Sequence, residues 1–176
     1  MGQLNNKDMK FLGFQKKYIE DALKDLYITK RMLLDDMVPE DTLDAFIRNK
    51  AEQYNGMLWN KSKEELREHL LMRKEEEAGK PTFEERFNEI FENPVIPSGE
   101  EMIADFLVIM EQRIERIYLA KRALKGFAEE TDLDMAIRDM AVQLDSLYKG
   151  LSEEDFEEAR NERMRETLRE YMEEKD

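Results

Sequence analysis

The chain contains an internal repeat. Residues 27–33 return as residues 118–124 at a spacing of 91, and after a slip of one residue the match continues at a spacing of 90. The slip falls at 39–42, where we expect a loop, and a change in loop length costs little free energy. Because apolar positions, capping positions and the slip keep one order over about fifty residues, we interpret the repeat as a duplication. The matched residues at the second spacing include Leu43, Asp44, Ile47, Arg48, Ala51 and Gln53, which meet Leu133, Asp134, Ile137, Arg138, Ala141 and Gln143.

The composition is typical of helices. Charged residues make up 40% of the chain, hydrophobic residues 41%, and only seven glycines occur among 176 residues. We therefore predict an all-α fold, a tandem repeat of two similar three-helix units. The first unit is expected at 1–78 and the second at 98–176. A proline-bounded connector at 79–97 should carry a short amphipathic helix with Phe83, Phe87, Ile90 and Phe91 on one face.

Apolar residues at helical spacing predict a long first helix in each unit, with its stripe facing a core. The stripe in the first unit consists of Phe11, Phe14, Tyr18, Ala22, Leu26, Leu33 and Leu34. The stripe in the second unit consists of Met102, Ile103, Phe106, Met110, Ile114, Ile117 and Leu124. Ser98 and Glu101 form a capping-box pattern, which predicts that the second of these helices begins near Ser98.

The second helices are predicted at 42–58 and 132–149. Asp41 is the expected cap of the first, and Thr131 or Asp132 of the other. Gly150 suits a left-handed residue that ends the helix. The third helices should begin at the capping residues Ser62 and Ser152 and, being poor in apolar residues, should lie on the outside.

Charge and residue types exclude several functions. The formal net charge is −14, which repels phosphate backbones and anionic lipids, so we expect neither direct nucleic-acid binding nor membrane binding. Thiolate chemistry and disulfides are excluded because the chain has no cysteine. We found no apolar leader and no run of roughly 18 apolar residues, and so expect a cytoplasmic protein.

Basic residues shared by the two halves are the candidate site residues. They could contact an anion or a carboxylate of a partner, one set per half. The alternative, which we favour, is that they pair with acidic residues of neighbouring helices. Trp59 either plugs the junction before the third helix or anchors a partner, and we favour the plug. The candidate partner contacts are Lys30, Arg31, Arg48, Trp59, Lys121, Arg122 and Arg138.

Carboxylate spacings typical of metal enzymes are also present, at 154–157 and at 111–115. In so acidic a chain we interpret them as solvated helix faces, and we predict no metal, no cofactor and no catalytic residue. His69 is the single histidine and has no nucleophile near it in sequence, so we do not expect a general base.

Three functions stay open. The first is a helical protein-interaction or scaffold module without catalytic activity, which binds a partner protein or a second copy of itself. The second is an acidic regulator that mimics nucleic acid on a basic protein, suggested by the acidic residues of the last helix. The third is an enzyme with a carboxylate-bound divalent metal.

Overall fold

The structure is a computed structural model that describes residues 5–80 and 99–175. The described residues form six α-helices and no strand, which confirms the predicted all-α class. The helices are α1 (Asn6–Asp35), α2 (Glu40–Trp59), α3 (Lys63–Ala78), α5 (Gly99–Ala123), α6 (Glu130–Gly150) and α7 (Glu153–Lys175). None of them is long and apolar enough to cross a membrane.

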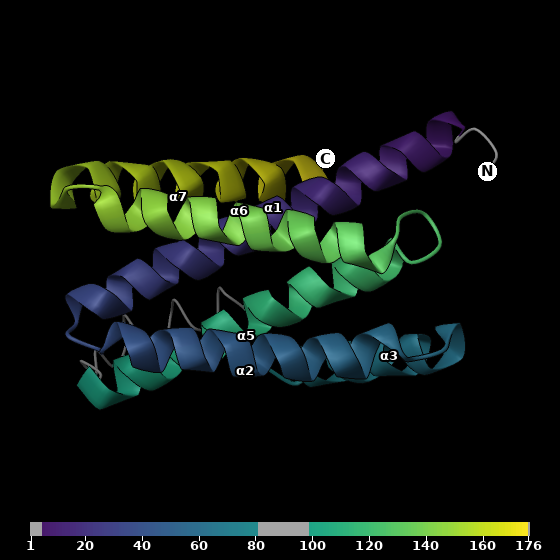
Figure 1. The fold of residues 1–176 in the computed structure, drawn as a ribbon, viewed down its shortest axis with the longest axis horizontal. Helices are drawn as coiled ribbons and strands as arrows, with labels where there is room; N and C mark the ends of the chain where they lie inside the picture. The colour runs from purple at the N-terminus through teal and green to yellow at the C-terminus, as the bar shows by residue number, and fades with distance from the viewer. Residues whose placement is uncertain (1–4, 81–98, 176) are drawn as a thin grey trace.

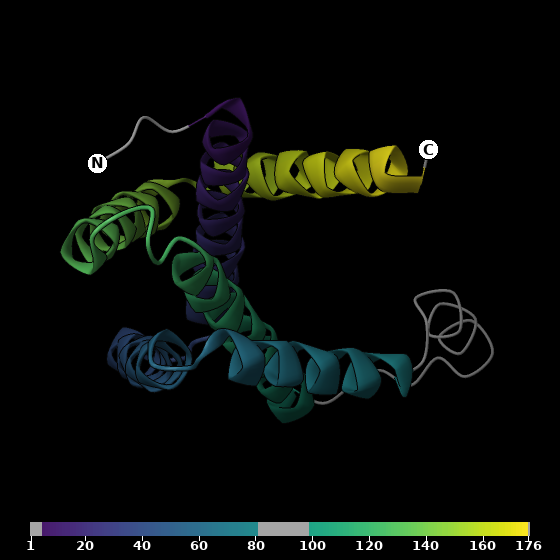
Figure 2. The ribbon, with the colours of Figure 1, turned by 90° about the vertical axis from the view of Figure 1, so that its right-hand side faces the viewer.

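Two long helices, α1 and α5, pack against each other in the middle of the molecule (Figure 1). Helix α6 packs along α1, and α2 packs along α5, so each central helix contacts one helix from the other end of the chain. Helices α3 and α7 project to the same side of the molecule, away from α2 and α6 (Figure 2). The arrangement interleaves the residues before 81 with those after 98.

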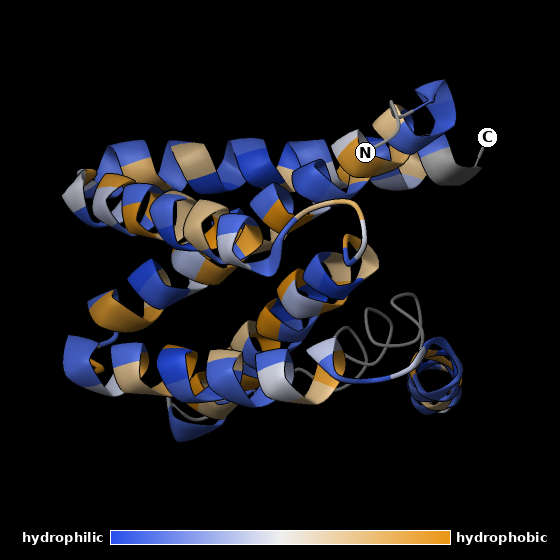
Figure 3. Ribbon diagram, turned by 45° about the vertical axis from the view of Figure 1, so that its right-hand side comes forward, coloured by the Kyte–Doolittle hydropathy of each residue, from blue (hydrophilic) through white to orange (hydrophobic). Residues whose placement is uncertain are grey.

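The core is one connected cluster of buried side chains. Figure 3 shows the hydrophobic residues of α5 in the middle of the molecule, between α2 and α6. The most deeply buried apolar residues are Leu23, Leu26, Leu33, Leu43, Leu58, Met110, Ile114, Ile117 and Leu124. Because this cluster draws on both sides of the connector, the two parts of the chain bury their apolar stripes together.

The apolar stripe predicted for the first helix faces the core except at Phe14 and Tyr18, and Phe11 and Leu34 pack against the core as partly buried residues. Ala22, Leu26 and Leu33 are buried, whereas Phe14 is 65% exposed and Tyr18 is exposed as well. The rings of Phe14 and Tyr18 stack on each other, with centroids 6.3 Å apart, on a face of α1 that the core does not cover. In α5, Met110, Ile114 and Ile117 are buried as predicted, and Met102 is exposed.

The predicted caps of the second helices are wrong. Helix α2 has Pro39 as N-cap and α6 has Glu129, and neither side chain makes a capping hydrogen bond. Both helices begin about one half-turn earlier than predicted, at Glu40 and Glu130. The reason is electrostatic. The carboxylates of these two glutamates lie in the first turn, where the helix dipole favours negative charge, and each also lies near a buried lysine.

The prediction of a left-handed Gly150 is also wrong. Gly150 is the last residue of α6, and Leu151 follows in an extended conformation with φ of −74°. Among the described glycines only Gly126, in the loop after α5, has a positive φ. Instead, Arg31 binds the backbone carbonyls at the end of α6, so the helix needs no left-handed residue to satisfy them.

The predicted starts of the third helices are confirmed. The Ser62 hydroxyl accepts from the amide of Glu65 at 3.1 Å, and the Ser152 hydroxyl accepts from the amide of Asp155 at 3.2 Å. Helix α3 has no buried residue, as expected for an outer helix. Ser98 and the expected helix with Phe83, Phe87, Ile90 and Phe91 lie outside the described residues.

Candidate functional site

Lys30, one of the candidate contacts, is buried in a cage of acidic residues. Its Nζ lies 2.7 Å from Asp44 Oδ1, 2.8 Å from Asp145 Oδ1 and 3.7 Å from Glu40 Oε1. Only 1% of its side chain is exposed. Burial alone lowers the pKa of Lys30, but the hydrogen bonds to Asp145 and Asp44 outweigh burial and raise it, so the ammonium stays charged.

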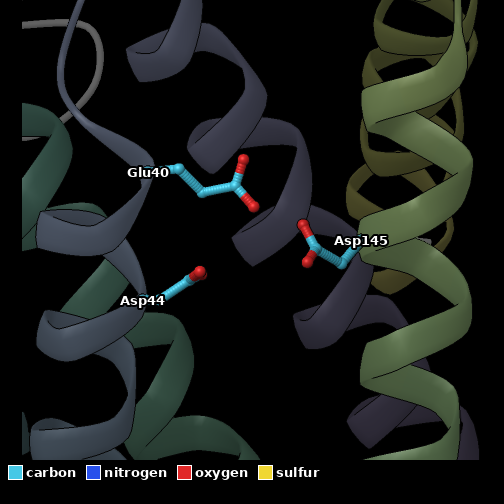
Figure 4. A group of neighbouring side chains, drawn as sticks. All are labelled: Glu40, Asp44 and Asp145. Carbon is cyan, nitrogen blue, oxygen red and sulfur yellow. The ribbon is translucent and has the colours of Figure 1, made fainter.

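The three carboxylates around Lys30 are close enough together to hold a metal ion. Figure 4 shows Glu40, Asp44 and Asp145 turned toward a common space between their helices. The Lys30 ammonium is already bound to all three, and Lys149 Nζ lies 2.7 Å from Glu40. A metal would have to displace a buried positive charge, so we interpret this cluster as an internal ion-pair network.

Lys121 has a matching environment. Its Nζ lies 2.7 Å from Asp134, 3.1 Å from Glu130 and 2.6 Å from Asn55 Oδ1, and its side chain is 1% exposed. The ammonium also lies 4.6 Å from the centre of the Trp59 ring. Trp59 is half-buried and packs against the core, in agreement with the plug interpretation.

Arg31 and Arg122 bind backbone carbonyls. Arg31 Nη1 donates to the carbonyls of Tyr148, Lys149 and Leu151 at 3.0 to 3.2 Å. Arg122 donates from Nε and Nη2 to the carbonyl of Lys61, at 3.3 and 2.9 Å. Each guanidinium therefore satisfies carbonyls at the end of a helix from the other part of the chain, which a planar fork of donors does well.

Arg48 and Arg138 lie on a groove at the surface. The groove has a volume of about 410 Å³, and its lining comes from α1, α2, α5 and α6. Both arginines are exposed, and neither has a hydrogen bond or an ion pair with any described residue. The structure thus brings these two together and leaves Lys30, Arg31, Lys121 and Arg122 engaged inside the molecule.

Of the carboxylates at metal-like spacings, Glu111 and Glu115 are engaged, whereas Glu154 and Glu157 are exposed and have no ion pair with any described residue. Glu111 accepts a hydrogen bond from Tyr54 at 2.7 Å and pairs with Lys50 at 3.2 Å. Glu115 is buried and pairs with Arg73 and with His69, whose Nε2 lies 3.4 Å from Glu115 Oε1. His69 thus lies against a buried ion pair. Among the described residues its hydrogen-bond partner is Glu115, and no hydroxyl group that could act as a nucleophile contacts it.

An exposed apolar stripe on α7 is a feature that the sequence analysis missed. Met164, Leu168, Tyr171 and Met172 lie at i, i+4, i+7 and i+8 and are 54 to 67% exposed. Helix α7 was expected to lie on the outside, and of its described apolar residues only Phe156 and Ala159 pack against the core. The signal was present. Arg160 and Arg163, four and seven residues beyond Phe156, are polar, and beyond Ala159 the apolar residues move to another face.

Fold and site together define an all-α protein with a shared core, an exposed apolar helix face and a separate groove that carries two arginines without an ion pair to any described residue. No protein-family model, no curated protein and no solved structure matches this chain.

Proposed function

We propose that the two parts of the chain are duplicates with one three-helix plan, at 1–78 and 98–176 with the connector at 79–97. The two lysine cages support this. Lys30 contacts Glu40, Asp44 and Asp145, and Lys121 contacts Glu130, Asp134 and Asn55. Each contact of Lys30 has its counterpart at the repeat spacing, and only the last pair differs in residue type, with Asn55 in place of an aspartate.

The arginines support the same proposal. Arg31 binds the carbonyl of Leu151, and Arg122 binds the carbonyl of Lys61, which stands 90 residues before Leu151. The third helix of each half also contributes one arginine that pairs with the first helix of the other half. Arg73 of α3 pairs with Glu115 of α5, and Arg163 of α7 pairs with Asp25 of α1. All four of these arginines bind a residue of the other half, so the halves interlock.

For function we propose a protein-interaction module without catalytic activity, in which α7 docks into a partner protein. The observation that carries this proposal is the exposure of Met164, Leu168 and Met172, which lie on one face of α7 and are 55 to 67% exposed. Large apolar side chains rarely gather on an exposed face without a role. An amphipathic helix with anchors at this spacing is a common means of binding an apolar groove.

The charge of α7 defines the kind of partner. Glu157 lies seven residues, two helical turns, before Met164 and thus on the same face, and Glu153 lies a turn earlier. Both are exposed. The proposed partner is a protein with an apolar groove that has basic residues at one end. We place it in the cytoplasm, which the lack of cysteine and hence of disulfides suits. A net charge of −14 disfavours nucleic acid or a membrane surface as the direct partner.

Affinity capture of partner proteins from the native cell, with the parent chain and two variants as bait, tests this proposal. The full chain with Leu168→Asp and Met172→Asp should lose the captured partner, because a charge at the centre of an apolar contact costs several kcal/mol. The matched control carries Met135→Asp and Val142→Asp, two equally exposed apolar residues of α6. Capture of the same proteins by both variants, at equal yield, contradicts the proposal. Light scattering of each variant shows whether the partner is a second copy.

The acidic surface of α7 favours a second candidate function, an acidic regulator of a basic nucleic-acid-binding protein. Glu166 pairs with Arg163, and Glu170 pairs with Lys17. The remaining acidic residues of this surface are exposed and have no ion pair with any described residue: Glu153, Glu154, Glu157, Glu158 and Glu162. Changing these five to glutamine should abolish capture if charge carries binding, and affinity should fall steeply with salt. Binding that depends on the apolar stripe and ignores salt rules this candidate out.

A further inference from the structure

The groove that contains Arg48 and Arg138 lies away from the α7 stripe, between α2 and α6 and over the packed pair α1 and α5. Its volume of about 410 Å³ is within the range of small-molecule sites. Most of its lining is apolar and comes in pairs at the repeat spacings. These pairs are Leu23 with Ile114, Leu26 with Ile117, Ile47 with Ile137, and Ala51 with Ala141.

Positive charge at the groove is not neutralised from within. Other arginines that reach between helices, such as Arg73 and Arg163, bind carboxylates, but Arg48 and Arg138 have no such partner among the described residues. Asp134 also lines the groove, where it is bound to Lys121. Glu52 is the one carboxylate of the lining without an ion pair to a described residue. The groove lining thus has two guanidinium groups and one carboxylate without an ion pair to a described residue, in a chain that is otherwise strongly acidic.

Two tyrosine hydroxyls add hydrogen-bond donors. Tyr27 and Tyr118 both line the groove, and neither hydroxyl has a hydrogen bond with any described residue. Burial raises the pKa of Tyr27 to about 12, and it also raises the pKa of Tyr118. Both hydroxyls are therefore protonated at neutral pH and can donate to an oxygen of a bound molecule.

We propose that the groove binds a small amphiphilic carboxylate, a free acid with an apolar chain. The chain lies on the isoleucine, leucine and alanine lining, and the carboxylate lies at the arginines, whose planar forks match its two oxygens. The tyrosine hydroxyls donate to the same head group. A sugar phosphate or a nucleotide is too polar for so apolar a lining. A protonated amine is repelled by the positive charge of the two arginines. The site is separate from the surface proposed for the partner protein.

Calorimetric titration of the full chain with decanoate tests this inference, with decanol and decylamine as probes of the same chain length. We expect saturable binding of decanoate, much weaker binding of decanol and none of decylamine. Changing Arg48→Gln and Arg138→Gln together should lower the affinity for decanoate by about tenfold or more and leave the affinity for decanol unchanged. The control Arg67→Gln with Arg165→Gln makes the same change of charge at two exposed arginines of α3 and α7 and should bind as the parent chain does.

Ala141→Phe fills the groove and should abolish binding of decanoate, with circular dichroism to show that the helices are kept. The inference is overturned if decanoate does not bind, if it binds no more tightly than decanol, or if the variant without Arg48 and Arg138 binds it as well as the control does. The variant with Leu168→Asp and Met172→Asp should bind decanoate unchanged, which separates this site from the docking of α7.

Discussion

Lys30 Nζ and Asp145 Oδ1 lie 2.8 Å apart, although 115 positions separate the two residues in the chain. The lysine is 1% exposed and the aspartate 27%. A buried ammonium needs partners, and this one receives them from α2 and from α6. The ion pair therefore ties the structure of α1 to the correct placement of a helix near the other end of the chain.

Changing Asp145→Asn should cost about 1 kcal/mol of the free energy of unfolding, because the amide oxygen still accepts from Lys30 but carries no charge. Asp145→Leu should cost about 2 to 3 kcal/mol, since it leaves a buried ammonium with fewer partners. The reverse change at the matching position, Asn55→Asp, should leave stability unchanged or raise it. Urea unfolding measures all three. A loss for Asn55→Asp as large as that for Asp145→Leu contradicts the matched roles of the two cages.

Arg31→Lys should destabilise the protein by about 1 to 2 kcal/mol. The single ammonium cannot bind the carbonyls of Tyr148, Lys149 and Leu151 with the geometry of a guanidinium, so the end of α6 loses hydrogen bonds. Thermal unfolding followed by circular dichroism measures the change. Arg165→Lys, at an exposed position of α7, is the control and should change little.

The helices themselves followed from local sequence patterns. Ser62 and Ser152 form the expected caps, and Met110, Ile114 and Ile117 of the stripe predicted for the first helix of the second unit are in the core. These features depend on residues a few positions apart, which fix side-chain direction on a helix.

The features that were missed depend on contacts between distant residues. Gly150 was expected to end a helix in the left-handed conformation, but Arg31, far away in sequence, satisfies the carbonyls there. Lys30 and Lys121 were expected to pair with acidic residues of neighbouring helices, and they do, but the sequence did not indicate that both are buried or that each also binds a residue of the other half, Asp145 and Asn55. Periodicity says which face of a helix is apolar, but not which distant helix will cover it.

Substitution by alanine should destabilise the protein far more at the start of α7 than near its end. Phe156 is buried, and its ring lies 5.2 Å from the Arg31 guanidinium, so Phe156→Ala should cost about 3 to 4 kcal/mol. Leu168 is 56% exposed, so Leu168→Ala should cost less than about 0.5 kcal/mol. Chemical unfolding compares the two. Equal losses would show that the outer stripe is packed within the molecule and is not free for a partner.

Stability should fall at low pH in part through Glu111. Burial alone raises the pKa of Glu111, but hydrogen bonds from Tyr54 and Lys50 outweigh it and lower the pKa below its ordinary value of 4.5. A lowered pKa in the folded state gives stability that is fully present above that ordinary value and is lost as the pH falls through the folded pKa. Glu111→Gln should therefore lower stability at pH 7 and flatten its decline below about pH 5. Urea unfolding at a series of pH values measures the slope, and an unchanged slope contradicts the assignment.

The account depends most on the interlocking of the two parts of the chain through one shared core. Circular dichroism of residues 1–80 and of residues 99–176, each expressed alone and then mixed, tests it directly. We predict that each fragment alone has much less helix than its share of the intact protein, since α1 and α5 lose each other, and Lys30 and Lys121 lose their contacts with Asp145 and Asn55. Mixing should restore the helical signal. A fragment that folds alone with full helical content and a cooperative thermal transition would contradict the shared core.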